Sequence, residues 1–75
     1  MNKDRRARIE TLAGKIEELK SEAEEIRDEE QEYHDNMPES LQGGEKGSAA
    51  EEAVSQLEEA VSGLEQAIDS LGQIE

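Results

Sequence analysis

Three consecutive seven-residue segments near the carboxyl end are near-copies of one another, and they constrain the fold more than any other feature. They read EEAVSQL (51–57), EEAVSGL (58–64) and EQAIDSL (65–71). Each copy puts Val or Ile at heptad position a, Leu at d and Ala at g. Apolar residues at a and d are typical of a helix that packs along another helix. The repeat therefore predicts a helix over 48–73, which starts at the capping-box sequence SAAE at Ser48.

The amino-terminal half shows the same heptad spacing without copied segments. Its apolar residues predict a helix over 4–35, which Asn2 or Asp4 caps and which ends before Pro38. We expect both rows of apolar residues to form its seam: Ile9, Ile16 and Ala23 at a, and Leu12, Leu19, Ile26 and Tyr33 at d.

Residues 36–47, NMPESLQGGEKG, contain the only proline and three of the six glycines, so they predict a connection with at most one short helical turn. Two heptad helices joined by so short a segment predict an all-α fold, an antiparallel two-helix coiled-coil hairpin in a single domain over 1–75. Because one hairpin has little core of its own, we expect a homo-oligomer that forms a helical bundle, either a two-fold dimer or a higher assembly.

The charge is large and unevenly distributed. The 75 residues contain 21 acids and 8 bases, with a net charge of −13. Residues 1–20 hold six bases and four acids, whereas residues 21–35 hold eight acids and only Arg27 as a base. This balance disfavours direct binding of DNA or RNA. The absence of cysteine excludes disulfides, and no apolar run predicts a membrane span or a secretory signal, so we expect a cytoplasmic protein.

Catalytic residue types are scarce. His34 is the only side chain that ordinarily titrates near neutral pH, and we interpret it as a solvent-facing residue at a helix end. Glu30 shares its helix face, but the carboxylate–histidine spacing of metal sites in helical bundles needs Glu at position 31, where this chain has Gln. We therefore expect no enzyme activity, no metal and no cofactor.

A basic cluster at the start of the first predicted helix is the best candidate for binding an anion. Lys3, Arg5, Arg6 and Arg8 fall within six residues, where the helix dipole also favours negative charge. We interpret Arg5, Arg6 and Arg8 as candidate phosphate ligands. The alternative is ion pairing, within the helix to Asp4 and Glu10 or across the hairpin to Asp69 and Glu75.

The connection offers a second candidate binding region. Tyr33, Asn36 and Gln42 supply donors and acceptors that could bind a ligand in a cleft closed by an oligomer, or they could simply close the end of the hairpin. The acids of residues 17–35 also have two interpretations. They solubilise the helix, or they imitate a phosphate backbone and occupy the nucleic-acid groove of a target protein.

The segment Arg27–Gly47, and DNMPESLQ (35–42) above all, resembles a family of short coiled-coil proteins encoded by phages and prophages of gut bacteria. The resemblance implies a phage setting, in which small non-enzymatic proteins neutralise host defences. Three functions then stay open: an oligomeric sponge that sequesters a cyclic nucleotide immune signal between subunits, an acidic mimic of nucleic acid that blocks a defence protein, and a structural phage coiled coil. In the sponge, we expect Arg5, Arg6 or Arg8 at the phosphate and Tyr33, Asn36 and Gln42 at the base or the ribose.

Overall fold

The computed structural model describes residues 1–75, and nearly all of them are helical. Helix α1 spans Lys3–Asp35, the short helix α2 spans Glu39–Gln42, and helix α3 spans Glu45–Gly72. The predicted all-α class is confirmed, since the chain has no strand. Neither long helix has an apolar segment that could span a lipid bilayer.

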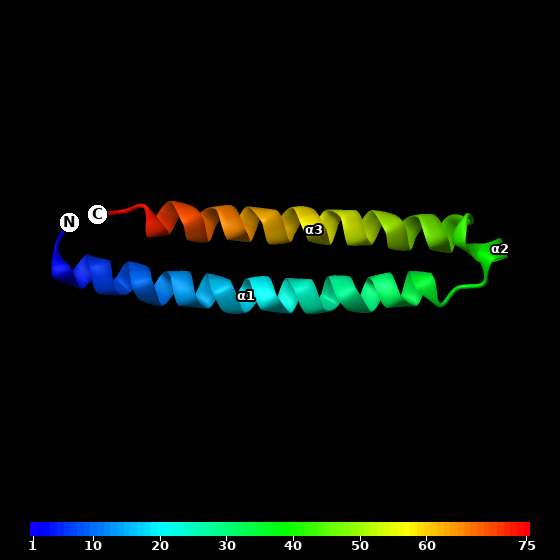
Figure 1. The fold of residues 1–75 in the computed structure, drawn as a ribbon, viewed down its shortest axis with the longest axis horizontal. Helices are drawn as coiled ribbons and strands as arrows, with labels where there is room; N and C mark the ends of the chain where they lie inside the picture. Colours follow the sequence, from blue (N-terminus) through cyan, green and yellow to red (C-terminus); the bar gives the residue numbers. More distant parts are fainter.

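Helices α1 and α3 lie side by side and run in opposite directions, so that both chain ends are at one end of the molecule (Figure 1). The result is a rod with extents of 59 × 14 × 12 Å. Its radius of gyration is 17.2 Å, whereas a compact domain of this length has about 11 Å. We call the end with the termini the open end, and the end with α2 the closed end.

Helix α1 begins and ends close to the predicted positions because its caps are encoded locally. The Asn2 side chain accepts a hydrogen bond of 2.8 Å from the main-chain N–H of Arg5, which satisfies one of the free donors of the first turn. Asn36 is the C-cap, and its N–H donates to the carbonyls of Glu32 and His34. Pro38 follows two residues later and prevents continuation of the helix.

Helix α3 begins three residues before the predicted start at Ser48. Its N-cap is Gly44, and Ser48 lies inside the helix, where its N–H donates to the Gly44 carbonyl at 2.9 Å. Glu45 lies in the first turn, where the helix dipole favours a carboxylate. The prediction of a capping box at Ser48 was wrong because Gly47, read as part of the connection, is buried within the helix.

The seam between the long helices differs from the prediction on one side. Helix α3 uses its a and d positions as expected, and all four buried residues of the chain lie on it. The half-buried residues of α1 lie at a and e, with Glu24 the one addition: Ile9, Ala13, Ile16, Lys20, Ala23, Arg27, Glu30 and His34. The d residues of α1, which we predicted in the seam, are exposed.

Two helices in contact bury only one stripe each, so α1 buries rows a and e against α3 and leaves row d exposed. At the e positions, Lys20 and His34 bring their ends close to acids of α3, whereas Arg27 pairs with Asp28 of its own helix. Lys20 Nζ lies 4.0 Å from Glu65 Oε1, and His34 Nε2 lies 3.1 Å from Glu51 Oε1. Both acids also occupy e positions, so the e sides of the two helices meet on the same flank of the rod.

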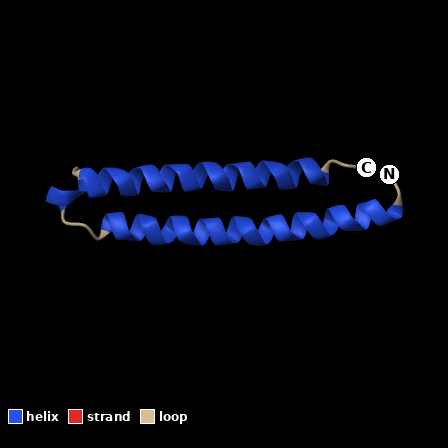
Figure 2. Cartoon of the chain, turned by 180° about the vertical axis from the view of Figure 1, so that it is seen from behind, coloured by secondary structure: helices blue, strands red, loops and turns tan.

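The connection folds back onto α3 through α2, which forms the short helical turn expected there (Figure 2). The Gln42 amide Nε2 donates to the carbonyls of His34, at 3.3 Å, and Met37, at 3.1 Å. These two bonds fasten α2 to the end of α1. Gly47 is buried and lies against the main chain of Gln42, so α2 packs directly on the first turn of α3.

Candidate functional site

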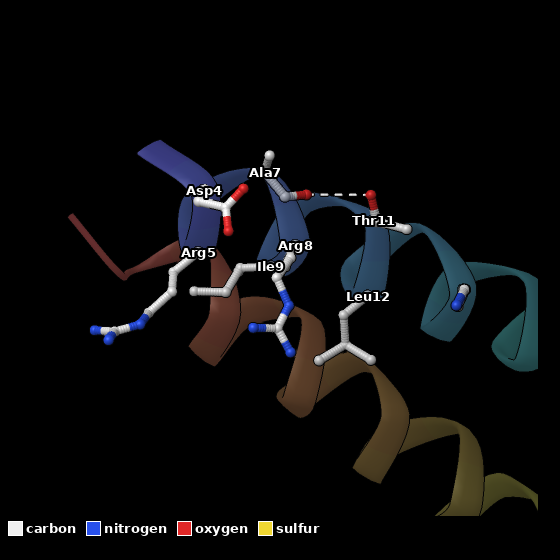
Figure 3. A pocket seen from close by; sticks show the side chains of 8 residues that line it. Asp4, Arg5, Ala7, Arg8, Ile9, Thr11 and Leu12 are labelled. Atoms are coloured by element: carbon white, nitrogen blue, oxygen red, sulfur yellow. Dashed lines mark hydrogen bonds between the residues drawn. The ribbon is translucent and has the colours of Figure 1, made fainter. Parts of the chain in front are cut away.

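A shallow hollow with a volume of about 550 Å³ lies on the first turns of α1, near the open end (Figure 3). We call it the basic hollow. All eight lining residues belong to α1, so a single helix forms its only wall: Asp4, Arg5, Ala7, Arg8, Ile9, Thr11, Leu12 and Lys15. Arg5, Arg8, Ile9 and Leu12 project to one side of the helix in Figure 3, and Ala7 and Thr11 project to another.

The three cations of the basic hollow have no acidic partner. The ion pairs of the chain involve only Lys20, Arg27 and His34 as bases. The expected pairing of Arg8 with Asp4, or of this end with Asp69, is therefore absent. Asp4 is the only acid in the lining, so a ligand with two or more negative charges would meet net positive charge there.

Arg6 differs from its two neighbours. Its guanidinium donates to the main-chain oxygen of Glu75 at the end of the chain, and it does not line the hollow. Of the three arginines proposed as phosphate ligands, the structure places Arg5 and Arg8 together and directs Arg6 elsewhere. Lys15 also lines the hollow and was not predicted, although it lies seven residues after Arg8 and so on the same helix face.

A second, smaller hollow of about 320 Å³ lies at the closed end, and we call it the connection hollow. It is lined by Tyr33, Met37, Leu41, Gly44, Glu45 and Lys46. Of the three residues predicted to contact a base or ribose, only Tyr33 lines it. Asn36 caps α1, and the amide of Gln42 is occupied by two main-chain carbonyls. The alternative interpretation of these two residues, closure of the helix pair, fits their positions.

His34 is mostly buried, with 13% of its side chain exposed, and the interpretation as a solvent-facing residue was wrong. It is enclosed because its e position faces α3. Its Nε2 lies 3.1 Å from Glu51 Oε1 and its Nδ1 3.6 Å from Asp35 Oδ1, and neither nitrogen makes a hydrogen bond. No three His, Asp or Glu side chains lie close enough together to hold a metal ion.

The acids of α1 form the third candidate surface. Between residues 17 and 35, six of them are exposed and have no basic partner: Glu17, Glu18, Glu22, Glu25, Glu29 and Glu32. Arg27, the only base in this region, pairs with its neighbour Asp28 at 3.0 Å. The outer surface of α1 therefore stays strongly anionic between the two hollows.

The two hollows cannot act on one small ligand within a single chain. Leu12 lines one and Tyr33 lines the other. The 21 residues of helix between them span about 30 Å.

No family model, no curated protein and no solved structure matches the chain.

Proposed function

We propose that this chain is a non-enzymatic binding protein, a coiled-coil hairpin that works as a homo-oligomer and sequesters a nucleotide between its subunits. The observation that carries the proposal is the basic hollow. Arg5, Arg8 and Lys15 stand unpaired around apolar Ile9 and Leu12, and no second wall exists within the chain. A ligand that is enclosed there needs another copy to cover it.

The chemistry of the hollow suits a phosphate attached to a less polar group. Guanidinium groups form bidentate hydrogen bonds to phosphate oxygens, and the amino-terminal end of α1 adds the positive end of its dipole. Ile9 and Leu12 offer apolar surface to a base or a sugar. Because the chain carries −13 overall, its field disfavours an anion at most other places on the surface.

The same residues favour binding without turnover. A general acid–base group near the scissile bond is the usual requirement for hydrolysis at neutral pH. The only histidine lies at the closed end, in contact with Glu51, and not in the basic hollow. In the phage setting implied by the resemblance of residues 35–42, the ligand would be a cyclic nucleotide that serves the host as an immune signal.

The alternative function, an acidic mimic that binds a basic host protein, has its own support in the unpaired acids of α1. Carboxylates that repeat along a helix without basic neighbours present a continuous anionic surface, and solvent screens it only partly. Salt separates the two functions. Binding of a basic protein would weaken steeply as ionic strength rises, whereas a ligand enclosed between subunits would be less sensitive.

The test is isothermal calorimetry and thermal melting with a panel of cyclic nucleotides on three proteins: wild type, Arg8→Ala and Arg6→Ala. The two variants lose the same charge within the same helical turn, but only Arg8 lines the hollow. Loss of a charge-assisted contact costs about 1.5–3 kcal/mol, or roughly 10- to 150-fold in affinity. We expect that loss for Arg8→Ala and much less for Arg6→Ala. Equal losses, or no melting shift with any nucleotide, would contradict the proposal.

A further inference from the structure

The exposed d row of α1 is the largest apolar feature that the fold leaves uncovered. Its four members have exposed fractions of 46% to 54%, and they repeat at about 10 Å intervals on one face: Leu12, Leu19, Ile26 and Tyr33. We call them the exposed stripe. Single exposed apolar residues are ordinary, but a continuous row of large ones along a helix marks a contact surface.

Helix geometry places small residues of α3 beside this stripe. The e positions of both helices meet on one flank, as the Lys20–Glu65 and His34–Glu51 contacts show. In an antiparallel pair the g positions of both helices then lie on the other flank, which is also the side toward which the d row of α1 is turned. The g residues of α3 are Ala53, Ala60 and Ala67, and their short side chains leave room for another helix.

The charges of α1 select both the occupant and its direction. Residues 1–20 carry a net +2 and residues 21–35 a net −7. A second α1 laid antiparallel on the first brings each basic half against an acidic half, whereas a parallel copy brings the two acidic halves together. The stripe fits the antiparallel direction, because a two-fold axis between residues 22 and 23 pairs Leu12 with Tyr33 and Leu19 with Ile26 of the second copy.

We propose that the exposed stripe is the interface with a second copy of this chain, in antiparallel register, and that this interface joins the two hollows. Leu12 lines the basic hollow and Tyr33 lines the connection hollow. Pairing these residues places the basic hollow of each copy against the connection hollow of the other. Two equivalent sites form, each with Arg5 and Arg8 from one chain and the Tyr33 ring from the other, while Lys15 faces Glu29 of the second copy and supports the register.

The ligand of the composite site rests on the proposed function, whereas the antiparallel register of the two chains does not depend on that function. Cationic groups from one copy would hold the phosphate, and the aromatic face of Tyr33 would stack on the base. Neither hollow alone supplies both kinds of contact. The dimer contact and the ligand site are therefore tested separately.

Disulfide trapping tests the register, because the chain has no cysteine of its own. Leu19→Cys protein is mixed with ¹⁵N-labelled Ile26→Cys protein and oxidised mildly, and mass spectrometry separates mixed from self-linked dimers. We expect mixed dimers in several-fold excess. Two copies of Leu19→Cys would hold their thiols seven residues apart, about 10 Å along the axis, and a disulfide requires Cα atoms about 4.4–6.8 Å apart.

The control is Ser62→Cys, an exposed position on the outer side of α3, which reports random collisions. Preferential self-linking of Leu19→Cys would indicate parallel pairing, and mixed linking at the Ser62→Cys level would exclude the stripe as the interface. Either result overturns the proposal. If removal of Leu19 reduces helicity, the pair Lys15→Cys and Glu29→Cys tests the same register from exposed flanking positions.

Complementation tests the shared site. Arg8→Ala and Tyr33→Ala proteins should each bind nucleotide at least tenfold more weakly than wild type. Mixed at equal amounts and allowed to exchange, they should recover full affinity in about a quarter of all sites, because each mixed two-fold dimer regains one intact site. Absence of recovery, with the disulfide result intact, would overturn the composite site. If wild type binds no nucleotide, the proposed function fails while the register stands.

Discussion

Gly47 offers the sharpest test of how the closed end is packed. It is buried in the first turn of α3, against the main chain of α2. A Cβ added at Gly47 would lie 2.7 Å from Gln42 Cα and still closer to the carbonyl carbon and oxygen of the same residue. Real Cβ atoms do not approach main-chain atoms so closely, so Gly47→Ala must displace α2.

Two opposing effects set the size of the change. Replacing glycine by alanine within a helix favours folding by about 0.5–1 kcal/mol. Overpacking against main-chain atoms costs about 1–3 kcal/mol. Displacement of α2 also weakens the Gln42 bonds to His34 and Met37, each of which contributes about 1 kcal/mol. We expect a net loss of about 1–3 kcal/mol in the free energy of unfolding.

Gly63→Ala is the matched control, because it lies in the same helix and its added Cβ has no atom within 4 Å. It should gain about 0.5–1 kcal/mol from helix propensity alone. Urea unfolding followed by circular dichroism at 222 nm, at one fixed protein concentration, measures both variants. If Gly47→Ala were as stable as Gly63→Ala, the packing of α2 on α3 would be refuted.

Three further predictions concern other parts of the molecule. Gln42→Ala should destabilise the fold by about 1–2 kcal/mol, measured by the same urea assay, because two carbonyls lose their donor; an unchanged midpoint would mean that water replaces the amide without cost. Val54→Ala should cost about 1–3 kcal/mol, since Val54 is buried and loses two methyl groups' worth of contact; Ser55→Ala, next to it and exposed, is the control and should change little. Protein purified from cells that produce a defence nucleotide should release it chemically unchanged on heating, as mass spectrometry of the supernatant would show; recovery of a cleaved product would contradict binding without turnover.

Most of the fold was predictable because heptad spacing is a local property. The a and d rows of α3, the caps of α1 and the short helical turn in the connection all follow from neighbouring residues. The row of α1 that faces α3 was not predictable in this way. Rows a, d and e lie next to each other, and which of them faces α3 depends on how two helices that are distant in the sequence pack together.

The candidate site was also predictable only in part. The grouping of Arg5 with Arg8 at one end, and the position of Tyr33 at the other, follow from helix geometry and antiparallel order. Arg6 donates to Glu75, and Gln42 donates to two main-chain carbonyls. Both contacts depend on where side chains point at the ends of the helices. Sequence spacing carries no information on those directions.

The open end of the rod has an architectural consequence. Any polypeptide that continues from residue 1 and any that continues from residue 75 would leave the molecule at the same place, since Arg6 contacts Glu75. A host protein could therefore accept the whole chain as an insertion in one surface loop without a large separation of the loop ends. The inserted chain would project as a stalk 59 Å long, and it would carry the closed end far from the surface that bears it.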